Sequence, residues 1–144
     1  MAFETFAVHA ACIRGVEAIH VTVEVSLAGG VPGIQMLGIP SMEVMESRGR
    51  IRCAMRSAGF EIPRSGITVN LAPADLRKEG SGLDLPIAIG LMTCGRILEP
   101  EKLENKVFIG ELSLDGRIRK VSGVLSMIMD AKKCGAQEVY IPQA

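Results

Sequence analysis

The stretch Thr68–Met92, TVNLAPADLRKEGSGLDLPIAIGLM, contains a strand, a loop and a helix in succession. Apolar and polar residues alternate over 67–71, which predicts a half-buried strand. Pro73 follows and ends the pairing, because proline has no N–H to donate to a neighbouring strand. Segment 74–82 is polar and contains glycines, so we expect it to be an exposed, mobile loop.

An apolar helix follows this loop. Asp84 can cap its N-terminus, and Pro86 suits the first turn, where backbone N–H groups have no partner within the helix. The apolar residues then recur at a spacing that buries a broad helix face: Ile87, Ala88, Leu91 and Met92. A glycine-rich loop entering a helix N-terminus often builds an anion site or an active site. The same arrangement also forms plain structural corners, so the chemistry has to be sought in the other residues.

The N-terminal part predicts a hairpin and a helix. Segments 3–13 and 16–27 are expected to be two strands joined at a turn over 14–15, followed by a short strand over 34–39. Ser41 is a good N-cap for a helix that ends near Ala58, with Gly59 just beyond its end. The helical period gives this helix a buried face that comprises Val44, Ile51, Met55 and Ala58.

Arg48, Arg52 and Arg56 form a stripe beside that buried face. One interpretation is that the three side chains are solvated and pair with glutamates at helical spacing. The other is that they form a contact surface for phosphate or for another domain.

The remaining chain predicts a second hairpin, a helix and a final strand. A strand over 107–114 should return through a two-residue turn at 115–116 into a strand over 117–121. Ser122 is a candidate cap for the last helix and Gly135 its candidate end, before a strand over 138–141. Strands and helices alternate only in the second half, which favours an α+β fold with a mixed sheet and helices on one side.

The composition bounds the possible functions. A chain of 144 residues suits one domain, and with 48% hydrophobic but only 3% aromatic residues its core must be aliphatic and rich in methionine. Sixteen acidic and sixteen basic residues cancel, so any binding to nucleic acid must come from a local basic patch. No apolar run is long enough to cross a membrane and no secretory signal is evident, so we expect a cytoplasmic protein.

The four cysteines are far apart, with no C-x-x-C pair and no histidine at ligand spacing. This pattern predicts buried, reduced thiols and no metal site. His9 and His20 are expected to be ordinary strand residues. No nucleotide-binding G-x-x-x-x-G-K-[ST] motif is present, so we expect no ATP hydrolysis by this segment. Ser81 and Lys120 are the candidates for a serine–lysine dyad, in which the lysine would deprotonate the serine.

Three ordered blocks carry a family resemblance: GIPSMEVMESRGRIRCAMRSAGF at 38–60, ITVNLAPADLRKEGSGLDLPIAIGLM at 67–92 and FIGELSLDGRIRKVSGVL at 108–125. They resemble the N-terminal domain of the magnesium-chelatase-like AAA+ ATPases, a family that includes the ComM-like competence proteins. The resemblance implies that residues 1–144 form a single Lon-like domain of a longer protein. The ATPase module and the C-terminal module of that protein would lie outside this chain.

This N-terminal domain is in turn similar to the proteolytic domain of Lon, which has the fold of domain 2 of ribosomal protein S5. In Lon the nucleophile follows a K-D-G-P-S loop and the lysine lies in a G-G-L-K run. Matched position by position, the place of the nucleophile falls on Gly82 and that of the lysine on Leu125. Ser81 lies one residue before the position of the nucleophile. Lys120 would sit about a turn and a half of helix from the place where the lysine amine is needed. The resemblance therefore implies that the fold is kept and the protease lost; the alternative is a residual Ser–Lys peptidase of Lon type.

The resemblance also implies a setting for the domain. It would be a non-catalytic part of a hexameric ring on DNA, in recombination and natural transformation, with its own AAA+ module and the neighbouring subunits as partners. This segment would need no cofactor, whereas the full-length protein would use ATP and Mg²⁺. Metal chelation by these residues is not indicated. The candidates for contacts to DNA phosphates are Arg48, Arg52, Arg56, Arg77 and Lys78.

Overall fold

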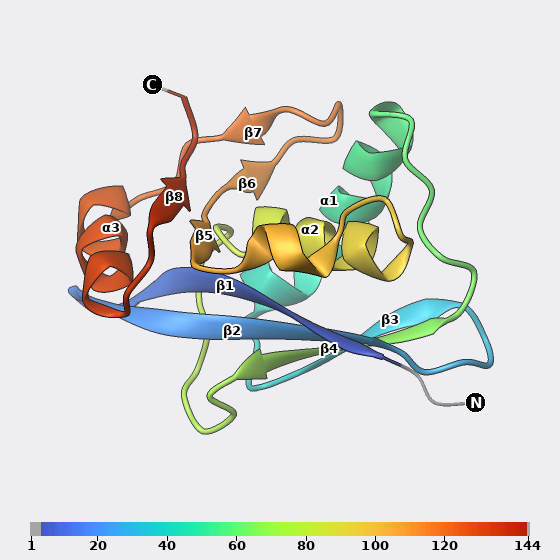
Figure 1. The fold of residues 1–144 in the computed structure, drawn as a ribbon, viewed down its shortest axis with the longest axis horizontal. Helices are drawn as coiled ribbons and strands as arrows, with labels where there is room; N and C mark the ends of the chain where they lie inside the picture. Colours follow the sequence, from blue (N-terminus) through green and yellow to red (C-terminus); the bar gives the residue numbers. More distant parts are fainter. Residues whose placement is uncertain (1–3, 144) are drawn as a thin grey trace.

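The computed structural model describes residues 4–143 as a mixed sheet with three α-helices (Figure 1). The six strands of this sheet run in the order β3-β4-β2-β1-β5-β8, and β6 and β7 form a separate two-stranded ribbon. The predicted α+β class with a mixed sheet is confirmed. The strands are β1 (Thr5–Arg14), β2 (Glu17–Leu27), β3 (Gly33–Leu37), β4 (Gly66–Ala72), β5 (Lys106–Phe108), β6 (Glu111–Leu112), β7 (Ile118–Arg119) and β8 (Glu138–Tyr140). The helices are α1 (Met42–Ser57), α2 (Asp84–Cys94), α3 (Val124–Lys133) and the short 3₁₀ helix η1 (Pro100–Leu103).

The long hairpin β1–β2 forms the centre of the sheet. Its register runs from Thr5 opposite Ser26 to Arg14 opposite Glu17, so the predicted hairpin is confirmed within the described residues, which exclude Phe3. β2 pairs antiparallel with β4, the strand predicted from the alternation over 67–71. The outer pairs β3–β4, β1–β5 and β5–β8 are parallel, which makes the sheet mixed.

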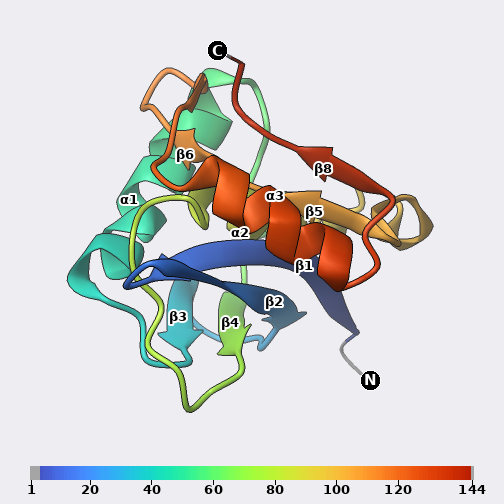
Figure 2. The same cartoon turned by 90° about the vertical axis from the view of Figure 1, so that its left-hand side faces the viewer.

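Two helices cover one face of the sheet and the third covers the other. Val8, Val23 and Val25 of the hairpin pack with α1 and α2 in the main core. Ala11 lies on the opposite face of β1, where it packs in a second core with Met127 of α3. The prediction of helices on one side is therefore right for α1 and α2 and wrong for α3, which lies across β1 and β2 on the far side (Figure 2). None of the helices in residues 4–143 combines the length and apolarity needed to cross a membrane.

The ends of α1 and α3 follow the sequence signals. The Oγ of Ser41 accepts a hydrogen bond from the N–H of Val44 at 3.3 Å, so Ser41 caps α1 as predicted. Gly59 adopts φ of +84° after α1 and Gly135 adopts +88° after α3, the left-handed conformation that glycine allows at a helix end. Ala54 of α1 is buried, however, whereas Ala58 follows the last residue of the helix and is exposed.

The second hairpin differs from its prediction. The expected strand 107–114 breaks at Gly110, whose carbonyl accepts a hydrogen bond from the N–H of Leu85 at the start of α2 (3.0 Å). The turn between β6 and β7 has three residues rather than two: Ser113 donates its N–H to the carbonyl of Arg117, and Gly116 adopts φ of +93°. Ser122 does not cap α3; Gly123 occupies that position with φ of +80° and no side-chain hydrogen bond.

The four thiols divide into two buried and two exposed groups. Cys12 and Cys94 lie in the core, and burial raises the pKa of the Cys94 thiol to about 11. Cys53 and Cys134 are exposed, so the prediction of four buried thiols is wrong for these two, which lie on the outer surface of α1 and at the end of α3.

Candidate functional site

An open hollow of about 320 Å³ lies where the loop before α2 meets β1 and the segment before α3. Ser81, Gly82 and Ser122 lie together in its wall, so the hollow includes the position that the Lon resemblance assigned to the nucleophile, Gly82. The other lining residues are Ala11, Cys12, Ile13, Glu43, Glu79, Gly80, Val121 and Met127. Among the described residues no lysine lines this hollow.

The groups at the Lon-like positions are separated from one another. A Cβ added at Gly82 would lie 3.6 Å from Cγ1 of Val121, so the backbone there has room for a side chain that this sequence lacks. The side chain of Leu125 is 72% exposed and does not line the hollow. Lys120 is exposed and also lies outside the lining. The structure thus places Ser81 beside Gly82 and leaves both Leu125 and Lys120 out of the hollow.

Lys78 is buried, in contrast to the exposed loop that the sequence predicted. Its Nζ donates hydrogen bonds to the carbonyls of Gly38, at 2.8 Å, and of Pro73. Burial lowers the pKa of this amine. Lys78 also exchanges backbone hydrogen bonds with Ile39 and Ser41, which fixes the loop against the start of α1. Because its amine is enclosed and donates to these carbonyls, Lys78 is not available for contacts to DNA phosphates.

Asp84 is the first residue of α2, but it does not cap the helix as the sequence predicted. Its fully buried carboxylate accepts hydrogen bonds from Nε of Arg50 at 2.7 Å, from Oγ of Ser47 at 2.5 Å and from the N–H of Leu112 at 3.0 Å. The hydrogen bond to Asp84 raises the pKa of the Arg50 guanidinium. One carboxylate therefore connects α1, α2 and β6. The sequence signal for this cluster was Ser47, a polar residue on the buried side of α1.

Three arginines converge on a second open hollow, of about 560 Å³, between the end of α1, the loop 60–65 and the start of β3. Arg52 and Arg56 come from the predicted stripe, and Arg64 joins them from the loop. Glu61 is the acidic residue in this wall. A neighbouring hollow of about 500 Å³ is lined by Arg48 and again by Arg52. We refer to Arg48, Arg52, Arg56 and Arg64 as the arginine surface.

Hydrogen bonds to backbone carbonyls orient Arg48 at the edge of the arginine surface. Arg48 donates from Nη1 to the carbonyl of Ile34 and from Nε to that of Met45, both at 3.3 Å, so its side chain lies over β3. Arg77 lines neither hollow, and its guanidinium pairs with Glu79 at 3.2 Å. Of the five predicted contact residues, the structure brings three together, adds Arg64, and places Arg77 and Lys78 elsewhere. Arg64 could not be predicted from the sequence, because a single arginine in a loop carries no periodic signal.

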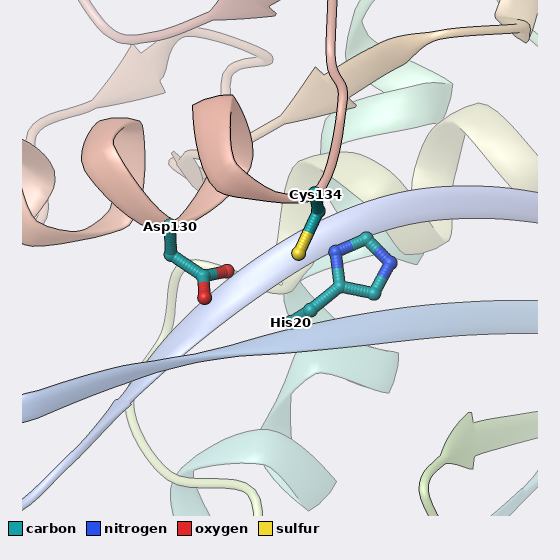
Figure 3. Close-up of side chains that lie close together, drawn as sticks. All are labelled: His20, Asp130 and Cys134. Carbon is teal, nitrogen blue, oxygen red and sulfur yellow. The ribbon is translucent and has the colours of Figure 1, made fainter.

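A third group combines possible metal ligands. Figure 3 shows Asp130 and Cys134 projecting from α3 toward the ring of His20 on β2. One ligand atom from each of the three residues lies within 4.8 Å of the others. Desolvation lowers the pKa of His20, and desolvation and the nearby Asp130 raise the pKa of the Cys134 thiol. The sequence signal was the i, i+4 spacing of Asp130 and Cys134, but the distant His20 gave no hint of the third residue.

Comparison with known proteins shows the family of this chain. The family model described as "Subunit ChlI of Mg-chelatase" matches residues 23–144. The chain belongs to this family. This ChlI-family chain is 45% identical over 128 residues to the YifB protein of Escherichia coli K12, and 44% identical over 136 residues to the competence protein ComM of Haemophilus influenzae. These matches cover 89% and 94% of the chain but only 25% and 27% of the relatives, so the chain spans about a quarter of their length.

A weaker similarity connects the ChlI-family chain to a protease. It is 30% identical over 88 residues to Lon protease 2 of Syntrophobacter fumaroxidans, which covers 60% of the chain and 11% of that protein. The resemblance to magnesium-chelatase-like proteins that the three sequence blocks carry is therefore confirmed, and the likeness to Lon has independent support.

Proposed function

We propose that this chain is a non-catalytic, Lon-like N-terminal domain of a magnesium-chelatase-like AAA+ ATPase, and that its arginine surface contacts the phosphates of DNA. The proposed contact to DNA rests on the convergence of Arg52, Arg56 and Arg64 on one open hollow. With Glu61 as the acidic residue in that wall, the hollow carries an excess of positive charge although the whole chain has a net charge of zero.

The chemistry of these side chains suits phosphate. A guanidinium group is planar, always charged at neutral pH and able to donate two parallel hydrogen bonds to phosphate oxygens. An open wall without a deep, shaped pocket gives no means to read bases, so binding should be independent of sequence and sensitive to salt. The domain would therefore help to hold nucleic acid while another module supplies the energy.

The setting of the domain is part of the same proposal. Its relatives are about four times as long as the stretch they share with it, and one of them is named a competence protein. We infer that the full-length protein binds ATP and Mg²⁺ in a separate AAA+ module, assembles as a hexameric ring in the cytoplasm and acts on DNA in recombination or transformation. The direct partners of this domain would be its own ATPase module and the neighbouring subunits.

The test compares the full-length protein with two variants that each carry four substitutions. In the first, Arg48, Arg52, Arg56 and Arg64 are replaced by alanine. The matched control replaces four exposed basic residues outside the surface, namely Arg14, Arg119, Lys132 and Lys133. DNA affinity is measured by fluorescence anisotropy at several salt concentrations, and circular dichroism verifies the fold of each variant.

The first variant should bind DNA more weakly. The slope of log binding constant against log salt concentration should become shallower by about 0.9 for each duplex phosphate that the protein no longer neutralises. The control should keep most of the affinity and the slope. If both variants behave like the unmodified protein, or if the control is weakened as much as the first variant, the arginine surface is not the contact site.

A further inference from the structure

We propose that His20, Asp130 and Cys134 bind one divalent transition-metal ion, for which zinc is the best fit. The site joins the C-terminal end of α3 to the central strand β2 (Figure 3). The donor atoms are an imidazole nitrogen, a carboxylate oxygen and a thiol sulfur, all within 4.8 Å of one another. Zinc accepts this mixture of nitrogen, oxygen and sulfur ligands, whereas magnesium and calcium prefer oxygen alone.

Two polar atoms of these residues have no hydrogen-bond partner in the described part of the chain. Nδ1 of His20 and the Oδ2 oxygen of Asp130 are inaccessible to solvent and have no hydrogen-bond partner among residues 4–143. Buried polar atoms are normally satisfied, because leaving them without a partner costs free energy. A cation between the two atoms would use both lone pairs at once.

His9 holds the ring of His20 in a suitable orientation. Nδ1 of His9 lies 3.1 Å from Nε2 of His20. When His20 carries its proton on Nε2, this N–H donates to His9 and leaves the lone pair of Nδ1 free for a metal. A ligand histidine whose second nitrogen donates a hydrogen bond is the usual arrangement around protein-bound metals.

The helix end favours a cation as well. Asp130 and Cys134 are four residues apart, so both side chains project from the same face of α3. Cys134 follows the last residue of the helix, where the unpaired carbonyl groups give the helix end a partial negative charge. With Zn–N, Zn–O and Zn–S bonds of about 2.0–2.3 Å, tetrahedral donors lie about 3.3–3.8 Å apart. Since no two donors are more than 4.8 Å apart, no pair has to close by more than roughly 1–1.5 Å, which rotations of the cysteine and aspartate side chains can supply.

Space for a fourth ligand exists beside the three residues. A cavity of about 90 Å³ adjoins His20 and Cys134 and is also lined by His9, Asn105 and Lys106. A water molecule occupies about 30 Å³ in the liquid, so the cavity can hold one. Three protein ligands and one water would complete a tetrahedral shell. The ion would fasten α3 to the sheet.

The test uses the 144-residue chain without a histidine tag, stripped of metal by a chelator. Co²⁺ is added as a spectroscopic substitute for zinc, and Zn²⁺ is then used to displace it in competition with a chromogenic chelator. The expected result is one Co²⁺ per chain with a thiolate-to-cobalt charge-transfer band, and a melting temperature that rises with Zn²⁺ concentration. A chain that shows no such band overturns the proposal.

Variants identify the ligands. Cys134→Ser should abolish the charge-transfer band, while Cys53→Ser, which alters the other exposed thiol, should leave it intact. Asp130→Asn provides a second ligand variant should the serine variant fail to fold, and it should weaken Co²⁺ binding at least about tenfold. His9→Phe removes the nearer partner of Nε2 of His20, leaving Oγ1 of Thr22 at 3.5 Å, and should weaken binding about 10- to 100-fold with the band retained. A band that persists unchanged in Cys134→Ser or an affinity unchanged in Asp130→Asn would overturn the proposal.

Discussion

Nε of Arg50 lies 2.7 Å from Oδ2 of Asp84, whose side chain is completely buried while that of Arg50 is 21% exposed. Arg50→Ala should lower the free energy of unfolding by about 3–5 kcal/mol, because it leaves the carboxylate buried without its cation. Asp84→Asn should cost less, since the partly exposed guanidinium can still reach water. Urea unfolding of the 144-residue chain measures both changes.

The control for this ion pair is Arg52→Ala, which removes an exposed arginine from the same helix and should change stability by less than about 0.5 kcal/mol. The double variant Arg50→Met, Asp84→Leu should cost less than the sum of the single changes, because it leaves no unpaired buried charge. Equal costs for Arg50→Ala and Arg52→Ala would show that the pair does not stabilise the junction of α1, α2 and β6.

Two glycines should respond to alanine in opposite directions. Gly49 lies within α1, where an added Cβ meets nothing within 4 Å, so Gly49→Ala should stabilise the chain by about 0.5–1 kcal/mol. Gly38 has φ of +102°, and an added Cβ would overlap the carbonyl oxygen of Leu71. Gly38→Ala should therefore destabilise the chain by more than about 2 kcal/mol. Thermal unfolding measures both, and a stabilised Gly38→Ala variant would contradict this backbone geometry.

Local patterns were enough to predict much of this fold. The caps at Ser41, Gly59 and Gly135 and the alternation in β4 depend on residues close together in sequence, and the structure confirms them. The partners of Asp84 could not be predicted, because its contacts to Arg50 and Ser47 cross 34 and 37 residues of sequence. The same is true of Lys78, whose polar neighbours in sequence suggested exposure although its amine binds the carbonyl of Gly38, 40 residues away.

The sequence of β1 carries a signal for the position of α3. Segment 6–13, FAVHAACI, is apolar at nearly every position, whereas a strand with one solvated face alternates. Such a run is typical of a strand covered on both faces, as β1 is by α2 and α3. The ligand cluster at His20 lies on the α3 side of the sheet, so it depended on the same missed feature.

The burial of Lys78 predicts its chemical reactivity. In native protein treated with an acetylating reagent, Lys78 should react far more slowly than Lys102, whose side chain is 70% exposed. A lowered pKa gives Lys78 a larger share of the reactive neutral amine, so slow reaction would report enclosure rather than protonation. Peptide mass spectrometry measures the rates, and in urea the difference should disappear. Fast native acetylation of Lys78 would show that the loop is open.

Ser81 should be an unactivated serine. Activation of a serine by lysine requires the amine within hydrogen-bond reach of the hydroxyl, at about 2.6–3.2 Å. Among the described residues no lysine lines the hollow around Ser81, Lys78 donates to two backbone carbonyls and Lys120 lies outside the lining. We therefore expect no covalent labelling of Ser81 by a fluorophosphonate probe under conditions that label an active Lon protease.

Peptide mass spectrometry after the reaction detects any adduct, and Ser81→Ala and Ser122→Ala separate the two serines of the hollow. Labelling that disappears in Ser81→Ala but survives in Ser122→Ala would require an activated hydroxyl at Ser81. Such a result would favour the residual peptidase over the non-catalytic domain, whatever the arginine surface binds. Absence of labelling in the unmodified chain agrees with a hollow in which glycine stands at position 82 and, among the described residues, no lysine lines the wall.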